Sequence, residues 1–224
     1  AGFARSAVSG IRRLPSPPAR TIPRTCGPRA TIATYRMART GGGREDGVVP
    51  VLRRPTTAVH RSFLEAVAEP GYRPGWAELL DLDRLRDPVA FADYVESQLA
   101  EAEEDAPRPP GWGPATHLWY IDGTTFLGRL SIRHVLTPWL RDYGGHIGYD
   151  VRPSARRHGH ATAMLRQALP WCAELGLADV LVTCDTDNVA SRRVIENAGG
   201  VFDDQRNGKL RYWVATAGRR RRAG

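Results

Sequence analysis

Residues 151–161 read Val151-Arg152-Pro153-Ser154-Ala155-Arg156-Arg157-His158-Gly159-His160-Ala161, between a predicted strand and a predicted helix. A loop in this position points several backbone N–H groups at one spot, and the helix dipole adds partial positive charge there. Gly159 lets the backbone approach a ligand closely, and Arg156 and Arg157 strengthen the positive field. These features suit a pyrophosphate, but a glycine in such a turn can equally serve packing alone.

Regular elements are predicted after this loop. The helix over 160–175 carries apolar residues at helical spacing, and Pro170 is expected to kink it. The continuously apolar run 178–184 predicts a strand that is covered on both faces. A short helix over 188–198, ended by Gly199 and Gly200, and two strands near 200–204 and 209–215 complete this half of the chain.

Before the loop, alternating patterns predict further strands. The runs 116–121 and 125–135 flank the turn Asp122-Gly123, which is typical of a hairpin, and a loop over 138–145 leads to a strand over 146–151. A first strand is predicted over 49–53. This order of elements predicts an α/β fold with a mixed sheet.

Two helices are predicted between the first strand and the hairpin. One begins at a cap formed by Thr56 or Thr57 and ends near Ala68. The other begins at Asp87 and Pro88, a typical cap and first-turn pair. The expected core-facing stripe of this second helix is Val89, Phe91 or Ala92, Val95 and Leu99.

The net charge of +8 lies in the two ends of the chain. Residues 1–36 hold seven arginines and no acid, residues 219–222 hold four more arginines, and the rest has 21 basic against 24 acidic residues. This distribution is typical of solvated, disordered tails. We therefore predict a disordered extension over 1–48, a folded domain over 49–216 and a basic tail over 217–224. The extension is either an organelle transit peptide or, as we favour, a dispensable segment upstream of Met37.

Cysteine content and hydropathy limit the class of protein. The three cysteines, Cys26, Cys172 and Cys184, are widely spaced, which predicts neither a disulfide framework nor a metal site and favours a reducing, cytoplasmic compartment. The sequence has no apolar run of about 18 residues or more, so no membrane-spanning helix is expected.

Two motifs resemble those of the GNAT (GCN5-related) acetyltransferases. Arg156-x-x-Gly159-x-Ala161 resembles the family signature (Q/R)-x-x-G-x-(G/A), and the segment 188–200 resembles the helix and turn of its second motif. The segments 130–134, 144–149 and 183–185 are similar to a bacterial GNAT subgroup of unassigned substrate. The resemblance covers roughly residues 49–215 and is weaker before residue 116. It implies a mostly antiparallel twisted sheet flanked by helices, with one splayed strand pair at the cofactor site.

The resemblance also implies an activity and a cosubstrate. The chain would move an acetyl group from acetyl-coenzyme A to a primary amine by direct transfer, without a metal. Backbone groups of Tyr149 and Val151 would bind the pantetheine arm, Asn188 would hydrogen-bond it, and Ser191 or Arg192 would lie along the same wall. Asn188 can also serve as a helix cap. The loop residues expected at the pyrophosphate are Arg156, Arg157, His158, Gly159, His160, Ala161 and Thr162.

Catalysis requires a base for the amine and often an acid for the thiolate. The usual acidic tyrosine of the family corresponds here to Ile195, so the thiolate would leave unaided or take its proton from water or another residue. His146 is the first candidate base, because its unperturbed pKa of about 6.5 suits the task and strand alternation places it on the face of Asp150. A structural role is the alternative for this histidine. His134, Asp150 and Asp185 are the further candidates.

Two alternative functions are also compatible with the sequence. A coenzyme A-binding module without catalysis would also fit the missing tyrosine, and a nucleic-acid-binding protein acting through its arginine tails is the alternative from another class. The acceptor is expected to be a small-molecule or peptide amine, with neither nucleic acid nor membrane as a partner. The sequence leaves the oligomeric state open, a homodimer included.

Overall fold

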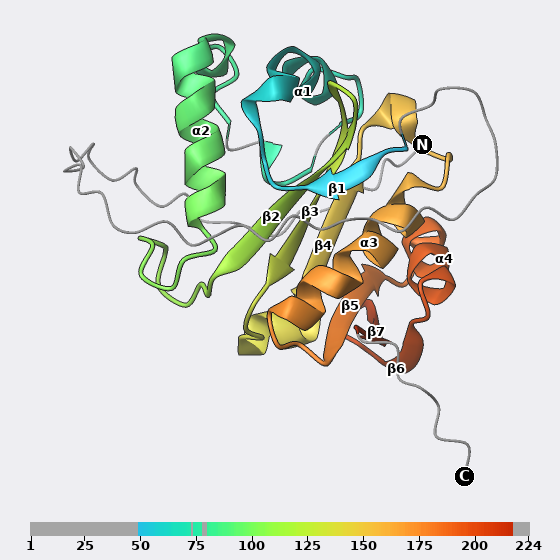
Figure 1. The fold of residues 1–224 in the computed structure, drawn as a ribbon. Coiled ribbons are helices and arrows are strands. Elements are labelled where there is room, and N and C mark those ends of the chain that lie inside the picture. The colour runs from blue at the N-terminus through green and yellow to red at the C-terminus, as the bar shows by residue number, and fades with distance from the viewer. Residues whose placement is uncertain (1–48, 73, 78–79, 217–224) are drawn as a thin grey trace, which may run out of the picture. The chain divides into compact units, whose positions relative to one another are not determined.

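The structure of the protein is a computed structural model that describes residues 49–72, 74–77 and 80–216. The predicted N-terminal extension and basic tail lie outside these described residues. Seven strands form one sheet in the order β1-β2-β3-β4-β5-β7-β6 (Figure 1). Their bounds are Val51–Arg53, Ala115–Asp122, Thr125–Arg133, Ile147–Val151, Asp179–Asp185, Val201–Arg206 for β6 and Lys209–Ala215 for β7. Every neighbouring pair is antiparallel except β4 and β5, which confirms the predicted mixed sheet.

In the part of the chain that the structure describes, four α-helices flank the sheet, two on each face (Figure 1). Helices α1 (His60–Val67) and α2 (Pro88–Ala100) pack on one face, and α3 (His160–Glu174) and α4 (Val189–Asn197) pack on the other. Asp87 caps α2 as predicted, since its Oδ1 accepts from Val89 N at 2.7 Å and from Ala90 N at 3.1 Å. None of the helices described here combines the length and apolar character that crossing a membrane requires.

Each face of the sheet has its own hydrophobic core. Under α3 and α4 the core is mostly aliphatic and includes the fully buried Leu130, Leu165 and Ile195. Under α1 and α2 the core is mostly aromatic, with Phe63, Phe91 and Trp119 at 0% exposure. Phe63 and Trp119 stack with ring centroids 5.1 Å apart. Side chains of β2 and β3 alternate between the two cores, so these strands join them.

Several local predictions need correction. Val89 is 71% exposed, because the core-facing stripe of α2 passes through Phe91 and Val95 and leaves the first turn in solvent. The hairpin turn is Gly123-Thr124, one residue later than predicted, and Asp122 pairs with Thr125. The segment predicted as a loop over 138–145 contains one π-helical turn, Leu140–Gly144. Strand β3 ends at Arg133 and not at residue 135.

The strands β4 and β5 meet at one end and then part. Their only register pair is Ile147 with Val182, whereas β4 stays paired with β3 as far as Val151. Gly145 makes the close approach possible, because a Cβ atom there would lie 2.5 Å from the Leu181 carbonyl oxygen. The predicted splayed strand pair is thus present, between the first and second halves of the sheet.

Candidate active site

The parting of β4 and β5 opens a cavity of about 250 Å³. Because side chains alternate along a strand, Tyr149 and Cys184 line it from the α4 face, while Gly148 and Thr183 line it from the opposite face. The cavity therefore reaches both faces of the sheet. Its lining residues are Tyr143, Gly144, Ile147, Gly148, Tyr149, Thr183, Cys184, Asp185, Asn188, Ser191 and Lys209.

On the α4 face, the cavity wall is a hydrogen-bonded chain from β4 to α4. The Tyr149 hydroxyl lies 2.7 Å from Ser191 Oγ, and Asn188 Oδ1 accepts from the Ser191 N–H at 2.9 Å. Asn188 is thus the N-cap of α4 and a lining residue at once. Burial raises the pKa of Tyr149 to about 12, although the hydrogen bond with Ser191 opposes the shift. The sequence indicated only backbone roles for Tyr149, and its side chain was missed.

The loop 156–159 leads from β4 into α3 with two left-handed residues. Arg157 has a φ of 67° and Gly159 a φ of 80°. Gly159 is the N-cap of α3 and supplies no side-chain hydrogen bond, so the first N–H groups of the helix have no partner within it. A Cβ atom on Gly159 would meet nothing within 4 Å. The helix start therefore faces open space with free donors, which is the geometry that suits an anion.

The other residues predicted to bind the cosubstrate differ in what their side chains contact. Arg156 Nε donates to the Val151 carbonyl at 3.1 Å, at the end of β4. Ala161 packs against the core, and Thr162 is half-buried beside it. His158 and His160 have ring centroids 5.9 Å apart. Arg192 is paired with Glu196 at 2.8 Å on the surface of α4, so no contact of its side chain joins the cavity wall.

Glu69, beyond the end of α1, fixes the beginning of the loop. Its carboxylate accepts from the Ser154 N–H at 2.8 Å, from the Ser154 hydroxyl at 2.7 Å and from Arg152 Nε at 2.6 Å. The Arg152 and Glu69 side chains are only 12% and 16% exposed. This anchor connects segments 83 residues apart in sequence, and no local pattern indicated it.

His146 joins β4 to β5 at the closed end of the splay. Its backbone N–H donates to the Leu181 carbonyl at 2.7 Å, and its Nδ1 accepts from the Leu181 N–H at 2.8 Å. Burial lowers the pKa of His146 to about 4, and the charges of Arg141 and Arg133 lower it further. The neutral ring then carries its proton on Nε2 and has no free lone pair. This geometry argues against the predicted base role and favours the structural alternative.

Asp150 is held on the α1 and α2 face, two residues along β4 from Gly148. Its Oδ1 accepts from the Tyr72 hydroxyl and its Oδ2 accepts from Trp76 Nε1 at 2.7 Å. Burial raises the pKa of Asp150 above its ordinary value, although these hydrogen bonds and the charge of Arg129 oppose the shift. Asp150 was predicted as a candidate base, but Tyr72 and Trp76 were not predicted as its partners.

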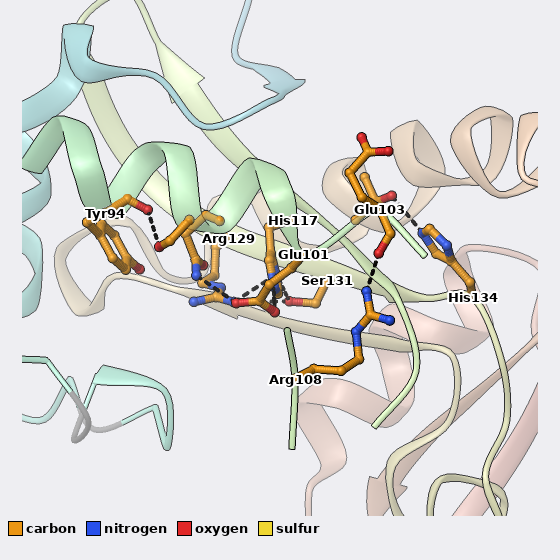
Figure 2. A network of polar contacts seen from close by, with 11 residues as sticks. Tyr94, Glu101, Glu103, Arg108, His117, Arg129, Ser131 and His134 are labelled. Atoms are coloured by element: carbon orange, nitrogen blue, oxygen red, sulfur yellow. Dashed lines mark hydrogen bonds and ion pairs between the residues drawn. The ribbon is translucent and has the colours of Figure 1, made fainter. Parts of the chain in front are cut away.

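A polar network runs from Arg129 on β3 through His117 on β2 to Glu101 at the end of α2 (Figure 2). Arg129, the cross-strand neighbour of Asp150, lies over the Trp76 ring at 4.5 Å and contacts His117 Nδ1 at 2.9 Å. His117 Nε2 contacts Glu101 at 2.7 Å. Burial lowers the pKa of His117, although the hydrogen bond that His117 donates to Glu101 opposes the shift. The acidic end of α2, predicted to be solvated or to attract an amine, is thus tied into the domain at Glu101.

Of the two other predicted bases, His134 and Asp185, only Asp185 lines the cavity. His134 Nε2 lies 2.8 Å from Thr116 Oγ1, beside the C-terminal end of α2 (Figure 2), and burial lowers the pKa of His134. It is not among the residues that line the cavity. Asp185 does line the cavity, but its carboxylate is 57% exposed and ion-paired with Lys209.

The cysteine thiols of the described residues are buried. Burial raises the pKa of Cys184, which keeps the thiol protonated and fits the predicted role of a small core residue. Cys172 and Cys184 are both free and buried. Within the described ranges, no cluster of three or more histidine, cysteine, aspartate or glutamate side chains has the spacing of a metal site.

Comparison with known proteins decides the family. The model of the acetyltransferase (GNAT) domain matches residues 51–201, about two thirds of the sequence. The chain belongs to the GNAT acetyltransferase family. Its fold and its coenzyme A-type cosubstrate follow from this membership, and acyl transfer is the reaction of the family. A search among curated proteins finds no match.

Solved structures share the GNAT fold at low sequence identity. The microcin C7 self-immunity acetyltransferase MccE, solved with acetyl-CoA and AMP, is 14% identical with a TM-score of 0.52, over 76% of this chain and 93% of that chain. A candidate GNAT-family acetyltransferase from Bordetella pertussis is 14% identical with a TM-score of 0.50, over 77% of this chain and 98% of that chain. At such identities the likeness concerns the fold alone.

Proposed function

We propose that this GNAT protein transfers the acetyl group of acetyl-CoA to a primary amine, directly and without an acyl-enzyme. One observation carries the proposal: β4 borders a cavity at Gly148 and Tyr149, carries the half-buried Asp150 next to them, and leads through its loop to a helix start with free N–H groups. The helix start suits the cosubstrate, and the carboxylate suits deprotonation of an amine. The reaction therefore takes place across the sheet, with donor and acceptor entering from different faces.

The cosubstrate side offers backbone donors and a narrow slot. The N–H groups at the start of α3 would hold the pyrophosphate, and the exposed edge of β4 beyond Ile147 would hydrogen-bond the pantetheine arm. Asn188 and Ser191 would form the opposite wall. Acetyl-CoA bound there supplies an activated thioester carbonyl to the cavity. The buried Ile147 and the partly buried Tyr149 form an uncharged lining that would exclude water from the side of the thioester that faces the core.

Asp150 is the base that this geometry favours. It shares a face with Gly148, and two residues along a strand span about 7 Å, which a bound amine or one bridging water can cover. The raised pKa of Asp150 brings this carboxylate closer to the acidity of the ammonium it must deprotonate. Tyr72 and Trp76 fix the orientation of both carboxylate oxygens. The proton that the amine loses would move to Asp150.

Tyr149 is the proposed proton donor for the departing thiolate. Ile195, at the position of the usual tyrosine, is fully buried, but the Tyr149 hydroxyl reaches the same helix from β4. A pKa of about 12 keeps this hydroxyl protonated at neutral pH. The Ser191 hydroxyl is positioned to pass a proton back to Tyr149 after transfer, because their oxygens lie 2.7 Å apart.

The free, buried thiols of Cys172 and Cys184 also support the expected cytoplasmic location.

Release of free thiol from acetyl-CoA, screened against a library of amines, tests the activity. Turnover with at least one amine, together with acetyl-CoA binding measured by calorimetry, is the expected result. Binding without any turnover would instead favour the alternative of a non-catalytic coenzyme A-binding module, and absence of both would remove the proposal.

A further inference from the structure

Arg133, the last residue of β3, places a guanidinium group behind the acceptor side of the cavity. Its Nη1 donates to the carbonyl oxygens of Gly144 at 3.0 Å and Gly145 at 3.2 Å. A Cβ atom built on Gly148 would lie only 3.2 Å from Arg133 Nη2. Gly144 and Gly148 both line the cavity, so the guanidinium lies directly behind two lining residues that have no side chain.

The charge of Arg133 is not compensated by any described residue. No carboxylate among residues 49–72, 74–77 and 80–216 lies within 4 Å of it, and its Nη2 and Nε have no hydrogen-bond partner in those ranges. Burial and the neighbouring charge of Arg129 lower the pKa of Arg133. These free donors are open to solvent, so they can exchange water for a carboxylate.

We propose that the acceptor is an amine that carries a carboxylate, and that Arg133 binds this carboxylate. The inference rests on the proposed function and names the class of its acceptor. A guanidinium offers a planar fork of N–H groups that matches a carboxylate, and here one side of the fork is free. Asp150 lies farther along the same face, about 7 Å from Gly148. Amine and carboxylate would thus bind to separate groups, Asp150 and Arg133, on either side of Gly148.

Matched pairs of amines test this acceptor class with the full chain. Within the pairs glycine and glycinamide, and β-alanine and β-alaninamide, the only structural difference is an amide in place of the carboxylate. The measurement is kcat/KM for thiol release from acetyl-CoA. A charged hydrogen bond to a carboxylate predicts a preference of about tenfold to a hundredfold for the acid member of at least one pair.

The variant Arg133→Met connects that preference to this residue. It should reduce the ratio of kcat/KM within the preferred pair to about one, while the affinity for acetyl-CoA stays within about twofold. Comparing ratios removes differences in amine reactivity and in the amount of folded protein. Arg133→Lys keeps the charge without the fork and should retain a smaller preference. Arg84→Gln, on an exposed surface turn, is the matched control and should keep the wild-type ratio.

Three results would overturn the inference. Equal use of both members by the wild-type protein would do so, and this arm needs no variant to fold. A preference that persists in Arg133→Met would place carboxylate recognition elsewhere. Acetylation of amides alone would exclude the acceptor class while acyl transfer itself stands. If no amine of either kind is acetylated, the proposed function fails and this inference fails with it.

Discussion

The two faces of the sheet differ in the chemical groups that they place near the cavity. On the α3 and α4 face, the site consists of backbone N–H groups, a glycine with positive φ and one pair of hydroxyls. On the α1 and α2 face, charged side chains of the two strands β3 and β4 lie near the lining residue Gly148, namely Arg129, Arg133 and Asp150. A common cosubstrate can be held by backbone geometry alone, whereas an individual acceptor requires individual side chains.

The largest effect is expected from Asp150→Asn, which should impair the acceptor face and leave the cosubstrate face unchanged. The amide cannot accept the amine proton, so kcat should fall by about 10²–10⁴ while acetyl-CoA affinity is unchanged. In the wild-type protein, kcat/KM should decrease as the pH falls toward the raised pKa of Asp150, at a higher pH than an ordinary aspartate would give. Steady-state kinetics and calorimetry measure both. A larger loss in Asp185→Asn than in Asp150→Asn would move the base to the exposed end of β5.

His146 tests whether the closed end of the splay is structural. Its pKa is about 4 in the folded protein and about 6.5 when unfolded, so the unfolded state binds more protons between these values. Stability is therefore full above about pH 6.5 and decreases as the pH falls toward 4, by about 3 kcal/mol at most from this residue. Urea denaturation at pH 7 and 4.5 should show a smaller acid loss in His146→Gln, which keeps an acceptor for Leu181.

Other histidines with lowered pKa values, such as His117, are present in both proteins, so their contribution cancels in that difference. Equal acid losses in the wild type and in His146→Gln would mean that the ring titrates normally. His146 would then again be a candidate base, and its role at the closed end of the β4 and β5 splay would not be structural alone.

Gly159→Asp should affect the cosubstrate face alone. A carboxylate at the start of α3 repels the pyrophosphate, so acetyl-CoA affinity should fall by about tenfold to a hundredfold. Gly176→Asp is a matched control, because Gly176 has a φ of 78° against 80° for Gly159 and also has nothing within 4 Å of its added Cβ. Both variants carry the same backbone strain, but only the first should weaken binding in calorimetry. Equal affinities in the two variants would remove the loop from the site.

Tyr149→Phe is expected to have the smallest effect. Loss of the proton donor should lower kcat by about tenfold, less than for the base, because a thiolate is a stable leaving group. The control is Tyr212→Phe, which removes another buried hydroxyl next to α4, one that contacts Glu196 at 3.3 Å and lies outside the cavity lining. An unchanged kcat in Tyr149→Phe would leave the thiolate to water.

Much of the fold, and the strand, loop and helix around Gly159, could be predicted because the signals are local. The Asp87 cap and the Asn188 cap each concern a few consecutive residues, and backbone hydrogen bonding gives them one outcome. The strand, loop and helix around Gly159 form one continuous segment, and the family model covers them in the same order. The predicted hairpin turn and the predicted end of β3 were wrong by one or two residues, because the alternating sequence pattern continues beyond the last backbone hydrogen bond between the strands.

The sequence by itself determined the family, the order of the elements and the loop between β4 and α3, since each depends on residues that are neighbours along the chain. Only the tertiary structure decided what the polar side chains do. His146 and Asp150 stand four residues apart on the same strand, yet one is bonded to the Leu181 backbone and the other is held by Tyr72 and Trp76. Those partners are 35 to 78 residues away in sequence. Burial and hydrogen bonding set the pKa of each group, and both depend on contacts that form only when distant segments pack together.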